Sequence, residues 1–380
     1  MFPWPLAAAI AALGAVVVAL GPGYVWWLRS LPRPADAEPA DPPAWPEVDV
    51  VLPVHNEAPY IAEKIRNLRA LDYPEDRIRF WIVDGASTDG TPALAARDAA
   101  GDERFTVADT PAASKSAQVN RALASCRAPW VLVTDVDCLL APDTLRRLVR
   151  KGESDPRIAA VGATVIPAAA HAGEALHWAV ADNLRVLEGA HGATSIVTGP
   201  CYIFRRDVMP SFAPGVVADD AHAAFRCAAA GRRVCFVPAV VSDVRSPHSL
   251  AEMVPHKYRK ARAYLREIVR FFPRIGSMHR RARQVFLWHA AQMIAGPPAA
   301  VALGAAMLAF VVAAGPWAWG GAAAASAVFL ADRRRRTAAG LSAVLVMALL
   351  AAVLSLPFPQ RPAYAKVDAR RASSADAGPS

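Results

Sequence analysis

Trp130-Val-Leu-Val-Thr-Asp-Val-Asp137 is an apolar strand that ends in two carboxylates one residue apart. Because side chains alternate along a strand, we expect Asp135 and Asp137 to point the same way and Val136 to point back into the protein. Two carboxylates at the carboxyl end of a buried strand suit a hard cation, Mg²⁺ or Mn²⁺. Open α/β sheets bind their ligands at that edge. A solvated turn at a strand end explains the same residues equally well, so the rest of the sequence has to decide.

The residues on either side of this strand predict an α/β domain with a mostly parallel sheet. Its first half alternates strands and helices, expected at 48–53, 58–71, 79–84, 91–99, 105–108, 116–125 and 130–134. Such alternation is typical of a parallel sheet covered on both faces. The second half alternates less regularly, with elements expected at 142–151, 158–162, 173–189, 195–204, 219–230 and 233–237. Mixed strand directions are therefore expected there.

The composition indicates that part of the chain meets lipid. Of its 380 residues, 54% are hydrophobic and 20% are charged, which is more apolar than soluble domains are. Residues 6–28 are long enough to cross a hydrocarbon core of about 30 Å. Because the first cations, Arg29 and Arg33, follow this segment, we interpret it as a retained anchor rather than a cleaved signal. The same cations place the residues after it in the cytoplasm.

Apolar and charged residues divide the chain into six expected parts. These are an N-terminal transmembrane anchor (1–28), a proline-rich linker (29–46), a cytosolic α/β domain (47–248), basic amphipathic interface helices (249–283), about three C-terminal transmembrane helices (284–356) and a disordered tail (357–380). The C-terminal spans are expected at 297–314, 317–330 and 338–356. The sequence therefore predicts a multi-pass protein of the cell membrane with about four spans.

The charges and cysteines narrow the classes of partner. The formal net charge is +9, and because the cations cluster beside apolar segments, they favour membrane lipids over nucleic acid. Residues 252–272 combine an apolar stripe with a basic face and predict a helix in the membrane interface. The alternative is a solvated basic face over the core of the domain. The five cysteines contain no Cys-x-x-Cys pair, so neither a disulfide framework nor a zinc site is indicated.

Three groups of polar residues precede Asp135 at strand ends and helix starts. Glu57 follows the first strand, where it can contact a ribose or base, or interact with the start of the next helix. Asp84 ends the second strand and can accept hydrogen bonds from a nucleoside, while Asp89 either joins it or caps the following helix. Lys115 stands near a helix start and can neutralise phosphate, or can simply be solvated.

A further pair of acids, Asp219 and Asp220, opens the helix expected at 219–230. Adjacent acids at a helix start can be caps and nothing more. A carboxylate beside an acceptor hydroxyl is also the usual general base that activates an oxygen nucleophile. On spacing alone, the cap is the better explanation.

Taken together and in this order, these groups resemble glycosyltransferase family 2, whose members are inverting and depend on nucleotide sugars. The resemblance runs from about Val48 to Ala263. Pro53-Val-His-Asn-Glu57 is similar to the Pro-x-x-Asn-Glu of the family, and Asp84-Gly-Ala-Ser-Thr-Asp-Gly-Thr91 to its nucleotide-binding Asp-Gly-Ser-x-Asp-Gly-Thr. Lys115 falls on the Gly-Lys segment, Asp135-Val-Asp137 on the metal motif, and Asp219-Asp220 on Glu-Asp.

The resemblance implies a nucleotide-sugar-binding fold of the glycosyltransferase A type and a role for each matching residue. Donor binding is implied for Pro53, Glu57, Asp84, Ser87, Asp89, Lys115 and Asp135. Asp135 and Asp137 would hold Mg²⁺ or Mn²⁺, and Asp220 would be the base, with Asp219 beside it. Gly199 would line the acceptor site, and Arg259 and Arg262 would add positive charge near the diphosphate. A UDP-sugar donor and a lipid-linked or glycan acceptor are implied.

One departure from the family concerns processive synthases, which carry Gln-x-x-Arg-Trp on an interface helix. Here the corresponding stretch is His256-Lys-Tyr-Arg-Lys260, which keeps Arg259 and lacks the glutamine and the tryptophan. Because that tryptophan stacks the acceptor sugar at the mouth of a channel, its loss favours the transfer of one or a few sugars. The alternatives are a processive polysaccharide synthase with a divergent motif, a nucleotidyltransferase and a catalytically inactive scaffold.

Overall fold

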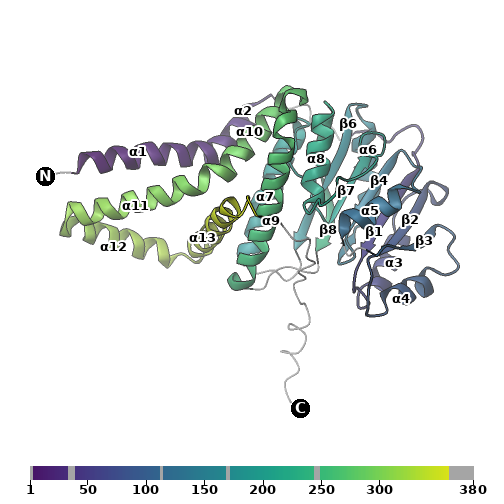
Figure 1. The fold of residues 1–380 in the computed structure, drawn as a ribbon. Helices are drawn as coiled ribbons and strands as arrows, with labels where there is room; N and C mark the ends of the chain where they lie inside the picture. The colour runs from purple at the N-terminus through teal and green to yellow at the C-terminus, as the bar shows by residue number, and fades with distance from the viewer. Residues whose placement is uncertain (1–2, 33–38, 112–113, 168–171, 244–248, 359–380) are drawn as a thin grey trace, which may run out of the picture.

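The computed structural model describes residues 3–32, 39–111, 114–167, 172–243 and 249–358. Within these residues, one eight-stranded sheet in the order β3-β2-β1-β4-β7-β6-β8-β5 forms the α/β domain. Apolar helices from the two ends of the chain extend from one side of it (Figure 1). The predicted fold class, a mostly parallel α/β sheet with apolar helices at both ends, is confirmed. Residues 33–38 of the expected linker and 359–380 of the expected disordered tail lie outside the described residues.

The first half of the sheet is parallel, as the alternation predicts. β1 (Val48–Val54) pairs in parallel with β2 (Ile78–Asp84) on one side and with β4 (Trp130–Thr134) on the other, and β2 pairs with β3 (Phe105–Asp109). Because all four strands run the same way, their carboxyl ends meet at one edge of the sheet.

Alternating apolar residues bury the two faces of these strands in two separate cores. On one face, Val48, Val50 and Leu52 of β1 pack with Ile61 and Ile65 of α3 (Ile61–Arg69). On the other face, Val51 packs with residues of α5 (Lys115–Leu123) and α8 (Asp219–Ala229). The first core also includes residues of α4 (Thr91–Ala99), α6 (Thr144–Glu153) and α7 (Ala172–Ala190). The sheet is thus covered on both faces.

The second half mixes strand directions. β7 (Cys201–Arg205) is antiparallel to both β4 and β6 (Ile158–Pro167), whereas β8 (Arg233–Asp243) is parallel to β6 and pairs antiparallel with the short β5 (Cys138–Leu140). The strand expected at 195–204 is partly wrong, because only its last four residues lie in β7. Residues 195–200 are irregular because their polar groups bond to side chains from other elements, as described below.

Three helices are long and apolar enough to cross a membrane among the described residues: Trp4–Ser30, Gly296–Ala314 and Arg335–Leu354. The first consists of α1 (Trp4–Val18), a π-helical turn η1 (Ala19–Gly23) around Pro22, and α2 (Tyr24–Ser30). Proline has no N–H to continue the helical pattern, and the wider turn accommodates it. α1 packs beside α11 (Gly296–Ala314) (Figure 1).

The prediction of about four spans needs a correction. The segment expected at 317–330 forms α12 (Pro316–Ala331), whose 16 residues rise about 24 Å, less than the ~30 Å of a hydrocarbon core. α13 (Arg333–Leu354) lies against α9 (Leu250–Phe271), and its buried residues Leu341, Val344, Ala348 and Ala352 recur at helical spacing. Three helices of spanning length therefore replace the four expected from the sequence.

The apolar stripe of α9 meets protein rather than lipid. Leu265, Ile268 and Phe271 are buried in a core that they share with α8 and with α10 (Arg280–Ile294). Val269 and Phe272 remain exposed, at 58% and 52%. The expected membrane contact of this stripe is thus wrong for its central residues, because neighbouring helices cover them.

Candidate functional site

The candidate site lies where the carboxyl ends of β1, β2 and β4 meet. Gln118 of α5, which is fully buried, fixes two of these ends by donating to the carbonyl oxygens of Val54 (2.6 Å) and Val83 (2.9 Å). Pro53 is buried in β1 beside Val83, beyond Val51, where the β1–β4 pairing ends. Its missing N–H therefore costs no bond to β4.

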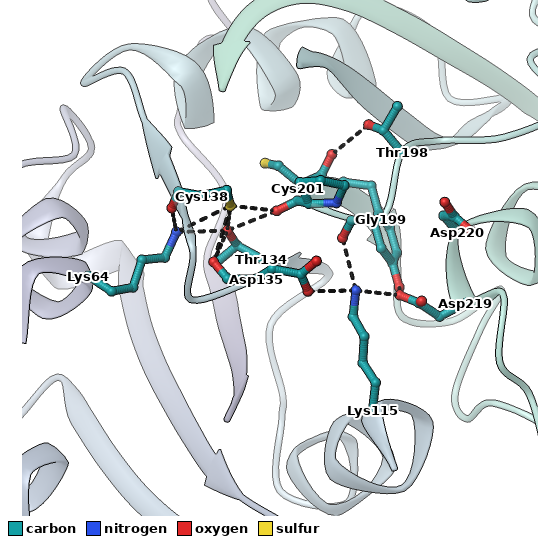
Figure 2. Close-up of polar contacts among 12 residues, drawn as sticks. Lys64, Lys115, Thr134, Asp135, Cys138, Thr198, Gly199, Cys201, Asp219 and Asp220 are labelled. Carbon is teal, nitrogen blue, oxygen red and sulfur yellow. Dashed lines mark hydrogen bonds and ion pairs between the residues drawn. The ribbon is translucent and has the colours of Figure 1, made fainter. Parts of the chain in front are cut away.

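Asp135 and Asp137 lie in the turn between β4 and β5 and are both partly exposed, whereas Val136 between them is buried. The expected alternation is therefore observed. A lysine that was not predicted from the sequence also supports this turn. The fully buried ammonium of Lys64 donates to the Thr134 hydroxyl (2.9 Å) and to the Cys138 carbonyl oxygen (2.6 Å), as Figure 2 shows.

Lys115, at the start of α5, is the centre of the site. Its Nζ lies 2.7 Å from Asp135 Oδ1 and 3.0 Å from Asp219 Oδ2, and it donates to the Gly199 carbonyl oxygen at 2.9 Å (Figure 2). Burial alone would lower the pKa of Lys115, but the two carboxylates outweigh it and hold that pKa well above its ordinary value. The positive charge of Lys115 thus contacts the turn after β4, the start of α8 and the segment 195–200.

Asp219 and Asp220 open α8 but have different surroundings. Asp219 is buried, and its Oδ2 also accepts a hydrogen bond of 2.7 Å from the Tyr202 hydroxyl. Burial raises the pKa of Asp219, with Lys115 opposing the shift and Asp220 adding to it. Asp220 is partly exposed, and its Oδ1 accepts from the Ala221 N–H at 2.8 Å. Asp220 is therefore the acid of the pair that solvent and a substrate can reach.

Gly199 leaves a space in front of Asp220. A methyl group at this position would lie 3.5 Å from Asp220 Oδ2 and 3.8 Å from Lys115 Nζ. Both distances are ordinary van der Waals contacts, so the space is the size of a small group between a carboxylate and an ammonium. Gly199 and Asp220 lie near each other (Figure 2), and the role of Gly199 at an acceptor site stays a prediction.

The loop after β2 is organised by two aspartates. Asp84 accepts from the Ser87 N–H (2.9 Å) and hydroxyl (2.5 Å), so these two predicted residues lie together. Asp89 accepts from the backbone N–H groups of Thr91 (3.1 Å) and Ala58 (3.0 Å). Burial opposes the shift, but hydrogen bonds led by that from the Thr91 hydroxyl lower the pKa of Asp89. Asp89 thus makes the helix-start contact that was one of its two interpretations.

The predicted Glu57 is buried beside the same loop. Its N–H donates to the Thr91 hydroxyl at 2.7 Å, and its carbonyl oxygen accepts from the Ile61 N–H at the start of α3. The preceding residue, Asn56, accepts from the Thr88 N–H at 2.8 Å. The loops after β1 and β2 are therefore held together as one surface.

Three non-glycine residues adopt left-handed backbone conformations, and all three lie at this site among the described residues. They are Asn56 (φ 53°), Ala86 (φ 59°) and Thr198 (φ 73°). Such residues cost free energy and persist where their surroundings impose them, often at functional sites. Their positions next to Glu57, Asp84 and Gly199 therefore support the assignment of the site.

The two predicted arginines on α9 are less closely tied to these carboxylates. Arg262 donates to the carbonyl oxygens of Ser355 (3.0 Å) and Phe358 (2.6 Å) at the end of α13. Positive charge is favourable at the C-terminus of a helix. Arg259 is half-buried, and burial lowers its pKa. A role for either arginine at a diphosphate stays a prediction.

Two of the residues that build the site were not predicted from sequence, Lys64 and Gln118. Lys64 lies between Ile61 and Leu68 at spacings of three and four residues, on the buried side of α3. A lysine in an apolar helical stripe is the signal that could have identified it. Gln118 has no comparable signal, because its two partners come from β1 and β2.

Comparison with known families assigns part of the chain to a family. Residues 49–211 match the family model described as Glycosyl transferase family 2. This part of the chain is a glycosyltransferase family 2 domain. The match includes Lys115, Asp135, Gly199 and Tyr202 and stops eight residues before Asp219.

Relatives of known name extend the likeness beyond the family 2 domain. An N-acetylglucosaminyltransferase of Mesorhizobium japonicum is 27% identical over 64% of this chain and 62% of its own length. A β-monoglucosyldiacylglycerol synthase of Synechocystis is 35% identical over 28% of this chain and 22% of its own. A mannosyltransferase from Pyrobaculum calidifontis, solved with GDP-Man and Mn²⁺, is 28% identical with a TM-score of 0.77, covering 94% of this chain and 100% of that one. The chain thus spans about six tenths of the first relative.

The residues at the turn after β4 fit a divalent cation that also contacts substrate. Among the described residues, no group of three or more His, Cys, Asp or Glu side chains is arranged to hold a metal. Asp135 and Asp137 nevertheless offer two partly exposed carboxylates on one turn. Mg²⁺ is commonly bound by one or two carboxylates together with substrate phosphates. The donor set therefore fits a cation that arrives with a diphosphate.

Proposed function

We propose that this protein is an inverting glycosyltransferase that moves a sugar from a nucleoside diphosphate sugar to a hydroxyl of a membrane-proximal, lipid-linked acceptor. The observation that carries the proposal is that Lys115 forms ion pairs with both Asp135 and Asp219. Asp220 and Gly199 lie beside these ion pairs. We name two parts of the site accordingly. The donor loops are residues 55–57, 84–91 and 135–137, and the acceptor segment is residues 195–200.

The donor loops supply the contacts for the nucleotide. Asp84 and Ser87 present polar atoms for the nucleoside, with Pro53, Glu57 and Asp89 shaping the loops. Lys115 supplies positive charge for the phosphates. Mg²⁺ or Mn²⁺ held by Asp135 and Asp137 would neutralise the charge of the departing diphosphate as a Lewis acid. The GDP-Man and Mn²⁺ of the Pyrobaculum mannosyltransferase support this arrangement.

The chemistry is a single displacement. Asp220 takes the proton of the acceptor hydroxyl as its oxygen attacks the anomeric carbon, and the bond from that carbon to the diphosphate oxygen breaks on the opposite side. The configuration is inverted, and the nucleoside diphosphate leaves. Asp219, held by Lys115 and Tyr202, keeps the start of α8 and therefore Asp220 in place. Asp220 is suited to the base role because it is the more exposed acid.

The membrane helices support an acceptor at the membrane surface. Three helices of spanning length lie to one side of the domain, and α9 stands between most of them and the sheet (Figure 1). The name of the Synechocystis relative, a synthase of a glucosylated diacylglycerol, points to the same class of acceptor. We further propose that the domain is cytoplasmic and that transfer is non-processive, since Gln-x-x-Arg-Trp is absent from 256–260.

The test uses membranes that contain the full-length protein. They are incubated with Mn²⁺ and, in separate reactions, with labelled UDP-GlcNAc, UDP-glucose and GDP-Man. Label from one donor is expected in the lipid fraction together with free nucleoside diphosphate. Long polymer would indicate a processive synthase instead, and pyrophosphate release would indicate a nucleotidyltransferase.

Asp220→Asn tests the assignment of the base. The substitution removes the proton acceptor and is expected to lower kcat by about 10²–10⁴-fold. Nucleotide affinity, measured by calorimetry, should stay within about twofold because Asp220 does not belong to the donor loops. Full activity of this variant would show that another group is the base.

A further inference from the structure

Glu188 on α7 is a fully buried carboxylate that joins elements distant in sequence. Its Oε1 accepts from the Tyr24 hydroxyl (2.8 Å) and contacts His289 Nε2 (2.6 Å), and its Oε2 accepts from both the N–H and the hydroxyl of Ser195 (3.1 Å each). Because a carboxylate can only accept, the network assigns the proton of His289 to Nε2. A buried charge with this many donors fixes the groups that surround it.

The combination of serine, histidine and glutamate does not form a nucleophilic triad. Ser195 Oγ and Glu188 Oε1 both approach His289 at Nε2, at 3.0 and 2.6 Å. In a triad, the nucleophile and the acid occupy opposite nitrogens of the ring, so that the imidazole passes a proton between them. The hydrogen bonds among Glu188, His289 and Ser195 therefore hold these residues in place and do not activate the serine.

One end of this network is the N-terminal anchor. Tyr24 is the first residue of α2, directly after the π-helical turn, and it is buried with Leu28 against Leu187 of α7. Gln292 of α10 donates to the Leu20 carbonyl oxygen within that turn at 2.5 Å. The end of the anchor is thus docked on α7 and α10 by polar groups as well as by apolar packing.

The other end is the acceptor segment. Ser195 is its first residue, and three further contacts hold the segment downstream. The Thr198 hydroxyl donates to the Ala163 carbonyl oxygen at 2.9 Å, Val197 packs directly on Gly162 of β6, and the Gly199 carbonyl oxygen accepts from Lys115. Since the segment lies outside the strands, these contacts, together with the hydrogen bond that the Asp135 N–H donates to the Pro200 carbonyl oxygen (3.1 Å), determine where Gly199 stands relative to Asp220.

We propose that Glu188 is a positioning residue for the acceptor, and that docking of the N-terminal anchor through Tyr24 completes the acceptor side of the site. This inference rests on the function proposed above. On this view the anchor is part of the catalytic structure and not only a tether. Loss of the Tyr24 or Glu188 contacts lets Ser195 move, and the acceptor hydroxyl is then less often aligned with Asp220, while the donor loops are unchanged.

The experiment compares Tyr24→Phe and Glu188→Gln with the wild-type full-length enzyme in membranes. Two rates are measured with the same labelled nucleotide sugar, namely transfer into the lipid fraction and hydrolysis of the donor by water. We expect transfer to fall about tenfold, as for modest misalignment of reacting groups. Donor hydrolysis and nucleotide affinity should stay within about twofold, so the ratio of transfer to hydrolysis is the decisive measure.

Glu174→Gln is the matched control. Glu174 is also a buried carboxylate on α7, but it pairs with Lys257 of α9 at 2.7 Å and not with the anchor. Its substitution should leave the ratio of transfer to hydrolysis unchanged even if thermal stability falls. Amide hydrogen exchange over 193–200 should rise in Tyr24→Phe and Glu188→Gln and not in Glu174→Gln.

The outcomes separate this inference from the proposed function. If the wild-type enzyme transfers no sugar, the proposed function fails. If it does transfer sugar, and both variants leave the ratio unchanged or shift it no more than Glu174→Gln does, the inference is overturned. Should Glu188→Gln fail to fold, Tyr24→Phe decides the question, because it removes a single hydroxyl.

Discussion

The donor loops follow parallel strands that pair with one another, whereas the acceptor segment lies outside the strands. Asp84 ends β2 and Asp135 follows β4, so the paired strands place both residues, and the turn at Asp84 is closed by Ser87. Ser195 and Gly199 are instead held by Glu188 and Lys115, which belong to helices. The donor side is thus placed by the edge of a regular sheet, with Lys64 supporting one of its turns, whereas the acceptor side depends on tertiary contacts throughout.

This difference predicts that a substitution on one side will change either donor binding or transfer to the acceptor, but not both. A substitution at a residue that contacts both sides should change both. Lys115 joins the two sides through its charge, since it contacts Asp135 on the donor side and Gly199 on the acceptor side.

Lys115→Met should impair both sides together. It leaves Asp219 buried without its cation, which costs about 3 kcal/mol of unfolding free energy when one partner of a buried pair is removed. Activity should fall by about 10²–10³-fold because a charge aimed at the phosphates is lost. Chemical denaturation and donor titration measure the two effects. If acceptor use alone suffered, Lys115 would belong to the acceptor side only.

Gly162→Ala should damage the acceptor side selectively. The new Cβ would lie 2.2 Å from the Val197 carbonyl oxygen, so the backbone of the acceptor segment has to move. Overpacking of this kind costs about 1–3 kcal/mol, and we expect a value near the upper end. Nucleotide affinity, followed by calorimetry, should change by less than about twofold. An equal loss of donor and acceptor binding would contradict the separation of the two sides.

Lys64→Met should weaken the donor side. Thr134 and Cys138 lose the ammonium that supports the turn carrying Asp135, while burial of a charge is relieved. An unsatisfied buried acceptor costs about 1–3 kcal/mol. Because relief of the buried charge offsets part of this cost, we expect a net loss of about 1 kcal/mol of unfolding free energy. Nucleotide affinity in the presence of Mn²⁺ should fall several-fold, with the ratio of transfer to hydrolysis preserved. A change in that ratio would argue against the assignment.

Gly199→Ala should have the smallest effect on stability and still alter the reaction. The methyl group meets Asp220 Oδ2 at 3.5 Å without a clash, so unfolding free energy should change by less than about 0.5 kcal/mol. Because the methyl occupies the space in front of the base, transfer to the acceptor should fall by about tenfold. Donor hydrolysis provides the internal control, since water still fits. Unchanged transfer would place the acceptor elsewhere.

Much of the α/β domain was predictable because its signals are local. Short apolar runs that end at polar residues placed β1, β2, β3 and β4 within a residue or two of their observed limits. The helix α4 was placed at its observed limits, since Gly90 and Thr91 mark its start. The irregular path of 195–200 was not predictable, because the β-branched residues Ile196, Val197 and Thr198 are typical of a strand. Its hydrogen-bonding partners are Glu188, Ala163 and Lys115, which lie on three other elements of the fold.

The packing of the membrane helices was likewise not predictable from the sequence. Apolar runs located the anchor and the C-terminal helices, and they already made the segment at α12 short, but composition could not show that α13 lies against α9. Likewise, the amphipathic pattern of α9 predicted an apolar stripe. The stripe contacts protein because α8, α10 and α13 pack against it.

Strand periodicity and turn residues act over a few positions, and they were enough to predict the parallel half of the sheet, the acids at its edge and the resemblance to family 2. The tertiary structure was needed to show that Lys115 bridges Asp135 and Asp219, that Lys64 supports the turn after β4, and that Glu188 links the anchor to Ser195. Each of these contacts pairs a buried charge with partners 7 to 164 residues away. A buried charge needs a hydrogen-bonded partner because an unpaired one costs free energy, but which residue becomes the partner depends on the fold.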